Sequence, residues 1–261
     1  MYRLITISTY LSLFTGFLCI GQTTPKATSF VQHVTILEQE QIEQELEAEV
    51  LSYSELLQKA KDQSRFVKKL FYKIQRDRLT NYANNARLDD LFIGQKDYDC
   101  VTGTAVYALV LDELGIDYSI KETDFHVYLL VHLPGKDILL EPTDPINGFI
   151  DNPIVIGDRI RAYRNGDAFG ASDNSRSESS KVDSYSTSFF RDRIISLTEL
   201  AGLQYYNLAT DAFNNGKYAE ANSLIEIALT LYPNDRFYGF RDILLIDMSQ
   251  SMSTNFSPRQ E

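Results

Sequence analysis

The stretch HVYLLVHLPGKDILLE, residues 126–141, constrains the fold more than any other part of the chain. Two apolar runs flank a Pro-Gly pair, which stands where a type II turn favours these two residues. The pattern predicts an antiparallel hairpin of two strands, His126 to His132 and Asp137 to Glu141, preceded by a strand from Asp117 to Lys121. HVYLLVH alternates little, which indicates a central strand covered on both faces.

The turn also sets which residues lie opposite each other. With two central turn residues, Leu133 faces Lys136 and His126 lies opposite Thr143; a loop one residue longer places Asp144 opposite His126 instead. Either register brings the Asp144 carboxylate within about 5 Å of the His126 backbone. We therefore expect Asp144 to orient the His126 imidazole.

The stretch YDCVTGTAVYALVLDELGI, residues 98–116, predicts a buried helix that begins at Cys100 and stops at Gly115. Free N–H groups at a helix start favour a thiolate, whereas the neighbouring Asp97 and Asp99 raise the pKa of the thiol. An adjacent imidazolium could outweigh these two carboxylates. The alternative is a buried, inert cysteine.

Two amphipathic helices are expected ahead of this region. Apolar residues recur at helical spacing from Ile36 to Leu57, and again from Phe66 to Ile74 after Asp62, which is a typical N-cap residue. The basic residues of the second helix are expected to face solvent. Three carboxylates near the strands, Glu122, Asp124 and Glu141, are interpreted as surface charges, with Asp124 close enough to His126 to tune it.

Residues 1–21 have the layout of a secretory signal peptide: one basic residue, an apolar stretch and small residues near the end. The alternatives are an uncleaved N-terminal membrane anchor or lipidation at Cys19. Cleavage would leave Cys100 as the only cysteine, so no intramolecular disulfide could form. The chain is then expected to be exported to the periplasm or secreted, with no integral membrane segment left.

The formal net charge of −11 argues against one class of partner. An acidic surface repels phosphate backbones, and the sequence has no basic patch to counter it. We therefore expect no nucleic-acid partner.

The C-terminal part is predicted to be separate from the first domain. Residues 171–190 are rich in Ser and indicate a flexible linker. Residues 200–235 match the spacing of a tetratricopeptide repeat, within a helical segment 191–248 that ends in a helix from Arg236 to Met248, and 249–261 is expected to be a disordered tail. One repeat cannot bury its own faces, so it must dock on the first domain, on a partner or on the helix that follows.

The order of Cys100, His126 and Asp144, in the motifs YDCVTGTAVYALVLDELGI, HVYLLV and LLEPTDP, resembles the transglutaminase-like superfamily of cysteine enzymes, in the bacterial branch that carries a tetratricopeptide-like tail. The resemblance implies an α+β fold with a papain/transglutaminase-like core in residues 34–170: N-terminal helices, a cysteine-bearing helix and an antiparallel sheet. It also implies that Cys100 attacks an amide carbonyl to give a thioester, that His126 is the base and then the acid, and that Asp144 orients it.

Further site features follow from the same resemblance. Gln95, five residues before the cysteine, could donate to an oxyanion, although a turn-exposed glutamine is the plainer interpretation. The family often has Trp directly after the cysteine, where this chain has Val101. No cofactor is needed, and neither His132 nor His33 forms a metal set with Cys100.

Two functions from different classes remain open. The first is an exported thiol hydrolase or acyltransferase, similar to cysteine proteases and transglutaminases, with a Cys100-His126-Asp144 catalytic triad and a peptide or protein as its substrate. The second is a catalytically inactive transglutaminase-like module that acts as a scaffold and recruits a protein partner through its C-terminal helices.

Overall fold

The computed structural model describes residues 30–31, 39–92, 94, 96–124, 126–165 and 192–255. Within these ranges the helices are α2 (Gln39–Gln58), α3 (Gln63–Asp77), α4 (Leu88–Phe92), α5 (Cys100–Glu113), α6 (Pro153–Asn165), α7 (Leu197–Asn214), α8 (Tyr218–Leu231) and α9 (Asp235–Asn255). The strands are β1 (Asn81–Tyr82), β2 (Asp97–Tyr98), β3 (Tyr118–Glu122), β4 (Val127–Leu133), β5 (Lys136–Leu140), β6 (Phe149–Ile150) and β7 (Arg193–Ile195). The expected α+β class is confirmed.

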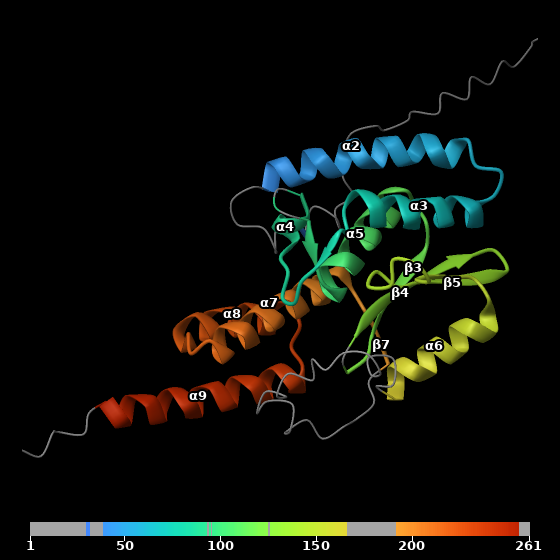
Figure 1. The fold of residues 1–261 in the computed structure, drawn as a ribbon. Helices are drawn as coiled ribbons and strands as arrows, with labels where there is room; N and C mark the ends of the chain where they lie inside the picture. Colours follow the sequence, from blue (N-terminus) through green and yellow to red (C-terminus); the bar gives the residue numbers. More distant parts are fainter. Residues whose placement is uncertain are drawn as a thin grey trace, which may run out of the picture.

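Five strands form one antiparallel sheet in the order β6-β5-β4-β3-β7. The sheet has helices on both faces: α5 packs on one face and α6 on the other (Figure 1). β4 is central and its residues 127–131 are all buried, as its near-continuous apolar sequence predicts. The predicted three-strand core is therefore present, with an edge strand added on each side.

The hairpin register agrees with a two-residue turn. Leu133 pairs with Lys136, and the pairing continues inward to Leu129 and Leu140, where the ladder ends. Gly135 has a φ of +82°, a conformation that glycine adopts without a steric penalty.

Local signals fixed the ends of two predicted helices. Asp62 accepts a hydrogen bond from the Arg65 N–H at the start of α3, as expected of an N-cap. Gly115 follows α5 with a φ of +64°, as expected of a helix stop.

The C-terminal helices pack against the rest of the chain. α7 packs antiparallel against α8 with Gly216 (φ +73°) in the turn, α9 packs on α8, and α7 also contacts α5 (Figure 1). Residues of α5, α7, α8 and α9 belong to one hydrophobic cluster. The hairpin therefore docks both on the first domain and on the following helix.

The structure changes two predicted boundaries. The segment expected to be helical from residue 191 first contributes β7 to the main sheet, so the two predicted domains share that sheet. α9 continues to Asn255, past the predicted end at Met248 and into the predicted tail. The predicted signal peptide 1–21 and linker 171–190 lie outside the described residues, and within the described ranges no helix is long and apolar enough to cross a membrane.

Candidate functional site

Cys100 is the first residue of α5, and the segment before it holds it in place. β1 and β2 form a short parallel pair, in which Tyr82 lies opposite Tyr98 with their rings 5.7 Å apart. Asp99 is the N-cap: its Oδ1 accepts hydrogen bonds from the Thr102 N–H and from Thr102 Oγ1, at 2.8 and 2.9 Å, while Thr102 Oγ1 accepts from the Asp99 N–H. This reciprocal capping box fixes the helix start.

The first turn of α5 packs closely against the loop that follows β5. A Cβ at Gly103 would lie 2.8 Å from Pro142 Cβ, so only glycine allows this approach. One turn along, Thr104 Oγ1 donates to the Val127 carbonyl at 3.4 Å, and the Val127 N–H faces the Cys100 sulfur, which lowers the pKa of the thiol. The sulfur therefore lies against the residue that directly follows His126.

The surroundings of Cys100 nevertheless favour the neutral thiol. Burial raises the pKa of Cys100 well above its usual range, and the charges of Asp99 and Glu141 raise it further. The prediction that Asp99 raises the pKa of the thiol is thus confirmed. The larger effect of burial on that pKa was not predicted. Burial also raises the pKa of Asp99 to about 6, against hydrogen bonds from Thr102 that lower it. Cys100 itself is half-buried.

His126 lies directly before β4 and pairs with a carboxylate. Its Nε2 is 2.6 Å from Glu141 Oε2, and both side chains are only 2% exposed. Burial acts to raise the pKa of Glu141, but the attraction of His126 and hydrogen bonds from His126, Thr143 and Tyr163 hold it well below its usual range. Glu141 is therefore ionised, and His126 Nε2–H donates to it.

Glu141 is held from two further directions. Its other oxygen, Oε1, accepts from the Thr143 N–H at 2.9 Å and from Thr143 Oγ1 at 2.6 Å. The Tyr163 hydroxyl, from α6, donates to Oε2, and the Tyr163 ring lies 4.9 Å from the His126 ring. A carboxylate with this many donors has one fixed orientation, and its hydrogen bond to Nε2 fixes the orientation of the His126 ring in turn.

Asp144, the residue expected to orient His126, has other partners in the structure. Asp144 Oδ2 is 3.5 Å from Arg159 of α6, and Asp144 Oδ1 accepts from the Asn147 N–H at 2.8 Å. The chain leaves β5 at Leu140 and closes a tight loop, in which the Gly148 N–H donates to the Asp144 carbonyl at 2.8 Å. Asp144 thus contacts α6, and the carboxylate that His126 Nε2 contacts is that of Glu141.

The surface assignment of Glu141 and Glu122 is wrong, because these residues are 2% and 3% exposed. The hairpin register contained the signal for Glu141. Continuing the Leu133 to Lys136 register places Glu141 opposite Tyr128, on the same sheet face as His126 and diagonal to it. Gln95, predicted as an oxyanion donor, lies outside the described residues.

The second histidine of β4 belongs to a different cluster. His132 Nε2 is 2.7 Å from Ser119 Oγ, and its Nδ1 is 2.9 Å from Asp137 Oδ1. The three residues come from neighbouring strands, and the Asp137 side chain is 55% exposed. We interpret them as cross-strand pairs on the sheet surface.

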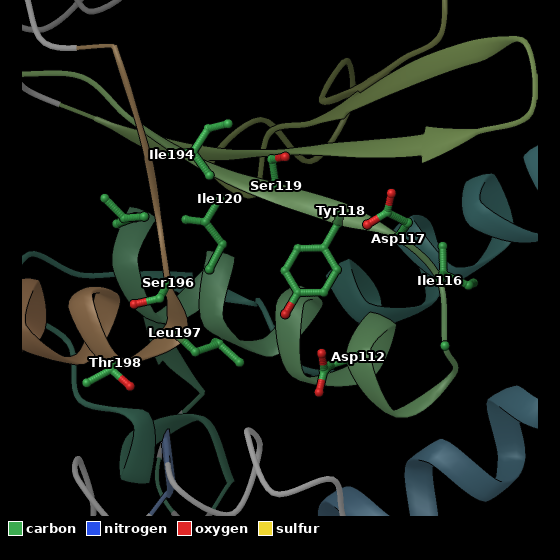
Figure 2. Close-up of a pocket in the computed structure, with 12 residues that line it drawn as sticks. Asp112, Ile116, Asp117, Tyr118, Ser119, Ile120, Ile194, Ser196, Leu197 and Thr198 are labelled. Atoms are coloured by element: carbon green, nitrogen blue, oxygen red, sulfur yellow. The ribbon is translucent and has the colours of Figure 1, made fainter.

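A pocket of about 680 Å³ lies at the other end of α5. Its lining comes from the end of α5 at Asp112, from residues 115–120 leading into β3, and from residues 194–198 at the end of β7 and the start of α7. Figure 2 shows Tyr118 and Ile120 pointing toward α5, whereas the Ser119 side chain points away from them. α5 has 14 residues, so about 20 Å of helix separates this pocket from Cys100.

Within the described ranges, His, Cys, Asp and Glu side chains form no group of three or more that could hold a metal ion. The features that could carry chemistry are thus a half-buried thiol at a helix start, whose sulfur lies against the Val127 backbone, and an imidazole on the preceding residue that is fixed by an ionised glutamate. Comparisons with family models, with curated proteins and with solved structures found no significant match for this chain.

Proposed function

We propose that the chain is a thiol enzyme of the transglutaminase-like kind, which cleaves or exchanges an amide bond of a peptide or protein through Cys100. The observation that carries the proposal is the buried hydrogen bond from His126 Nε2 to Glu141. The Cys100 sulfur faces the backbone N–H of Val127, the residue that follows His126. A nucleophile, a base and a group that orients the base are the parts of an activated thiol. In this proposal Glu141 takes the orienting role that the sequence assigned to Asp144.

The reaction would proceed in two acyl transfers. Because Nε2 is bound to Glu141, the Cys100 proton goes to His126 Nδ1 as the sulfur attacks the carbonyl carbon. The C–N bond then breaks, and the leaving amine takes the proton from the imidazole, which leaves a thioester on Cys100. Water or a second amine then attacks the thioester carbonyl carbon and gives a proton to His126. The C–S bond breaks, the acid or amide product leaves, and the imidazole returns the proton to the Cys100 sulfur.

The electrostatics favour one variant of this chemistry. Since burial, Asp99 and Glu141 all raise the pKa of the Cys100 thiol, the resting Cys100 is a neutral thiol. The imidazole therefore acts as a general base during attack, and no preformed thiolate is required.

The proposal is tested by alkylating the full-length protein with iodoacetamide at neutral pH and following Cys100 by peptide mass spectrometry, which separates it from Cys19. We expect His126→Ala to slow labelling of Cys100 by at least about tenfold, whereas Asp144→Asn leaves the rate unchanged. Equal labelling rates in the unaltered protein and both variants would remove the basis for a thiol enzyme.

A second candidate function has its own support. The 2% exposure of the His126 side chain and the raised pKa of Cys100 suit a transglutaminase-like fold kept as an interaction module. On α9, Tyr238, Leu245 and Ile246 are 41%, 48% and 56% exposed and could contact a protein partner. Under this alternative, Cys100→Ser leaves both the biological activity and the captured partners unchanged.

A further inference from the structure

The connection between β3 and β4, which leads into His126, is held by residues from the C-terminal helices. Glu122, the last residue of β3, is 3% exposed. Its Oε1 accepts from Arg236 at 2.8 Å and its Oε2 accepts from the Tyr232 hydroxyl at 2.5 Å. Both donors come from the junction of α8 and α9, more than 100 residues further along the chain.

Arg236 reaches past Glu122 to the connection itself. Its Nη1 donates to the Asp124 carbonyl at 3.2 Å, while its guanidinium lies 5.0 Å from the Tyr206 ring centre and 5.4 Å from that of Phe237. The side chain is 20% exposed, so these contacts are made largely out of water. A planar guanidinium that stacks on rings and donates in two directions has little freedom to move.

Within the same connection, Thr123 hydrogen-bonds to the backbone of His126. The Thr123 N–H donates to the His126 carbonyl at 2.8 Å, and Thr123 Oγ1 donates to that carbonyl at 3.2 Å. Arg236 thus donates hydrogen bonds to Glu122 and Asp124, the residues on either side of Thr123, and Thr123 donates to the His126 carbonyl. The chain of contacts runs without a break from the start of α9 to the proposed base.

We infer that Arg236 is a positioning residue, which fixes the backbone of His126 through Glu122 and Asp124 and makes the C-terminal helices part of the thiol site. This inference rests on the proposed function of Cys100 and His126. It gives the C-terminal segment a role other than peptide capture: without the α8–α9 junction, the imidazole would lose the fixed backbone from which Glu141 orients it.

The test needs a variant that does not leave Glu122 as a buried, unpaired charge. Glu122→Gln with Arg236→Met removes both charges together and keeps an acceptor for the Tyr232 hydroxyl. The matched control is Arg241→Met, since Arg241 lies on the same helix but pairs with Glu226 of α8 at 3.8 Å. Melting temperatures of all three proteins report whether the fold survives.

Two readouts decide the inference. We expect the Thr123 amide to exchange with solvent about tenfold faster in the double variant than in Arg241→Met, since a lost hydrogen bond to a charged group is worth about that factor. We also expect His126→Ala to have less effect when it is added to the double variant. There it should slow alkylation of Cys100 by a factor near one, instead of the roughly tenfold expected in the unaltered protein. A purely structural role for Arg236 would lower the melting temperature and leave this factor unchanged.

Thr123 exchange at the rate of the control would overturn the inference. So would faster exchange with an undiminished His126 factor, since the connection would then move without moving the imidazole. If the unaltered protein itself shows no His126 effect on alkylation, the proposed function fails, while Thr123 exchange still reports whether Arg236 holds the connection.

Discussion

His126 Nε2 lies 2.6 Å from Glu141 Oε2, and neither side chain has appreciable contact with solvent. Such a pair fixes both the tautomer and the orientation of the ring, because Nε2 must carry a proton to donate and the carboxylate cannot turn away. Nδ1 then lies on the opposite side of the ring. The pair therefore determines which ring nitrogen can exchange a proton with a neighbouring group.

Replacing Glu141 by Gln should disturb His126, whereas replacing Asp144 by Asn should not. Glu141→Gln removes a buried, charge-assisted hydrogen bond, so we expect the free energy of unfolding to fall by about 2 kcal/mol. Asp144→Asn keeps the acceptor for the Asn147 N–H and weakens a half-exposed pair with Arg159, for a cost below about 1 kcal/mol. Urea unfolding gives both values, and imidazole ¹⁵N shifts show which variant perturbs the ring. A larger ring perturbation by Asp144→Asn would contradict the assignment of Glu141.

The contribution of Glu141 to stability should depend on pH. Its pKa is lower in the folded protein than in the unfolded chain, so the stabilisation is complete above about pH 4.3 and is lost as the pH falls through the folded value. The difference in urea midpoint between the unaltered protein and Glu141→Gln should therefore shrink from pH 6 to pH 3. A difference that stays constant over this range would mean that Glu141 is not ionised in the fold.

Asp99→Asn should stabilise the protein near neutral pH and make Cys100 more reactive. The pKa of Asp99 is raised to about 6, so its protonation stabilises the fold below about pH 3.9 and this stabilisation is lost as the pH rises through 6. Asn keeps the N-cap acceptor without the buried charge. The variant should gain stability relative to the unaltered protein between pH 4 and pH 7. Loss of the neighbouring charge also lowers the pKa of Cys100, which faster iodoacetamide labelling at pH 8 would reveal.

Two tyrosine hydroxyls on the same side of the sheet should behave in opposite ways. Tyr163→Phe removes a hydrogen bond to the ionised Glu141 but keeps the ring against His126, at a cost of about 2 kcal/mol. The matched control is Tyr128→Phe, because the buried Tyr128 hydroxyl has no hydrogen-bond partner among the described residues. That change should be neutral or stabilising. Thermal unfolding of both variants checks the prediction, and equal losses would contradict it.

Gly103→Ala should separate the first turn of α5 from the loop after β5. The added Cβ would lie 2.8 Å from Pro142 Cβ, and relieving that overlap is expected to cost about 1–3 kcal/mol. Gly157→Ala in α6 meets nothing within 4 Å and should stabilise the helix by up to about 1 kcal/mol. Denaturant titrations compare the two. An unchanged midpoint for Gly103→Ala would mean that the helix and the loop are not in close contact.

The sequence by itself determined what depends on neighbours in the chain. Asp62 caps α3, Gly115 ends α5, and the Pro-Gly turn sets the pairing of Leu133 with Lys136, because each signal acts within a few residues. These local signals were enough for the α+β class, for the placement of Cys100 at a helix start and for the helical hairpin near the C-terminus. The short pair of β1 and β2 carried no such signal.

Only the tertiary structure decided which carboxylate meets His126. The sequence assigned this role to Asp144 and indicated that Glu141 and Glu122 were surface charges. The choice came from contacts between distant segments: Tyr163 of α6 fixes Glu141, Arg159 of the same helix draws Asp144 away, and Arg236 of α9 neutralises Glu122. A buried carboxylate needs a partner, and Glu141 and Glu122 each have one on a helix whose position relative to the sheet the sequence did not fix.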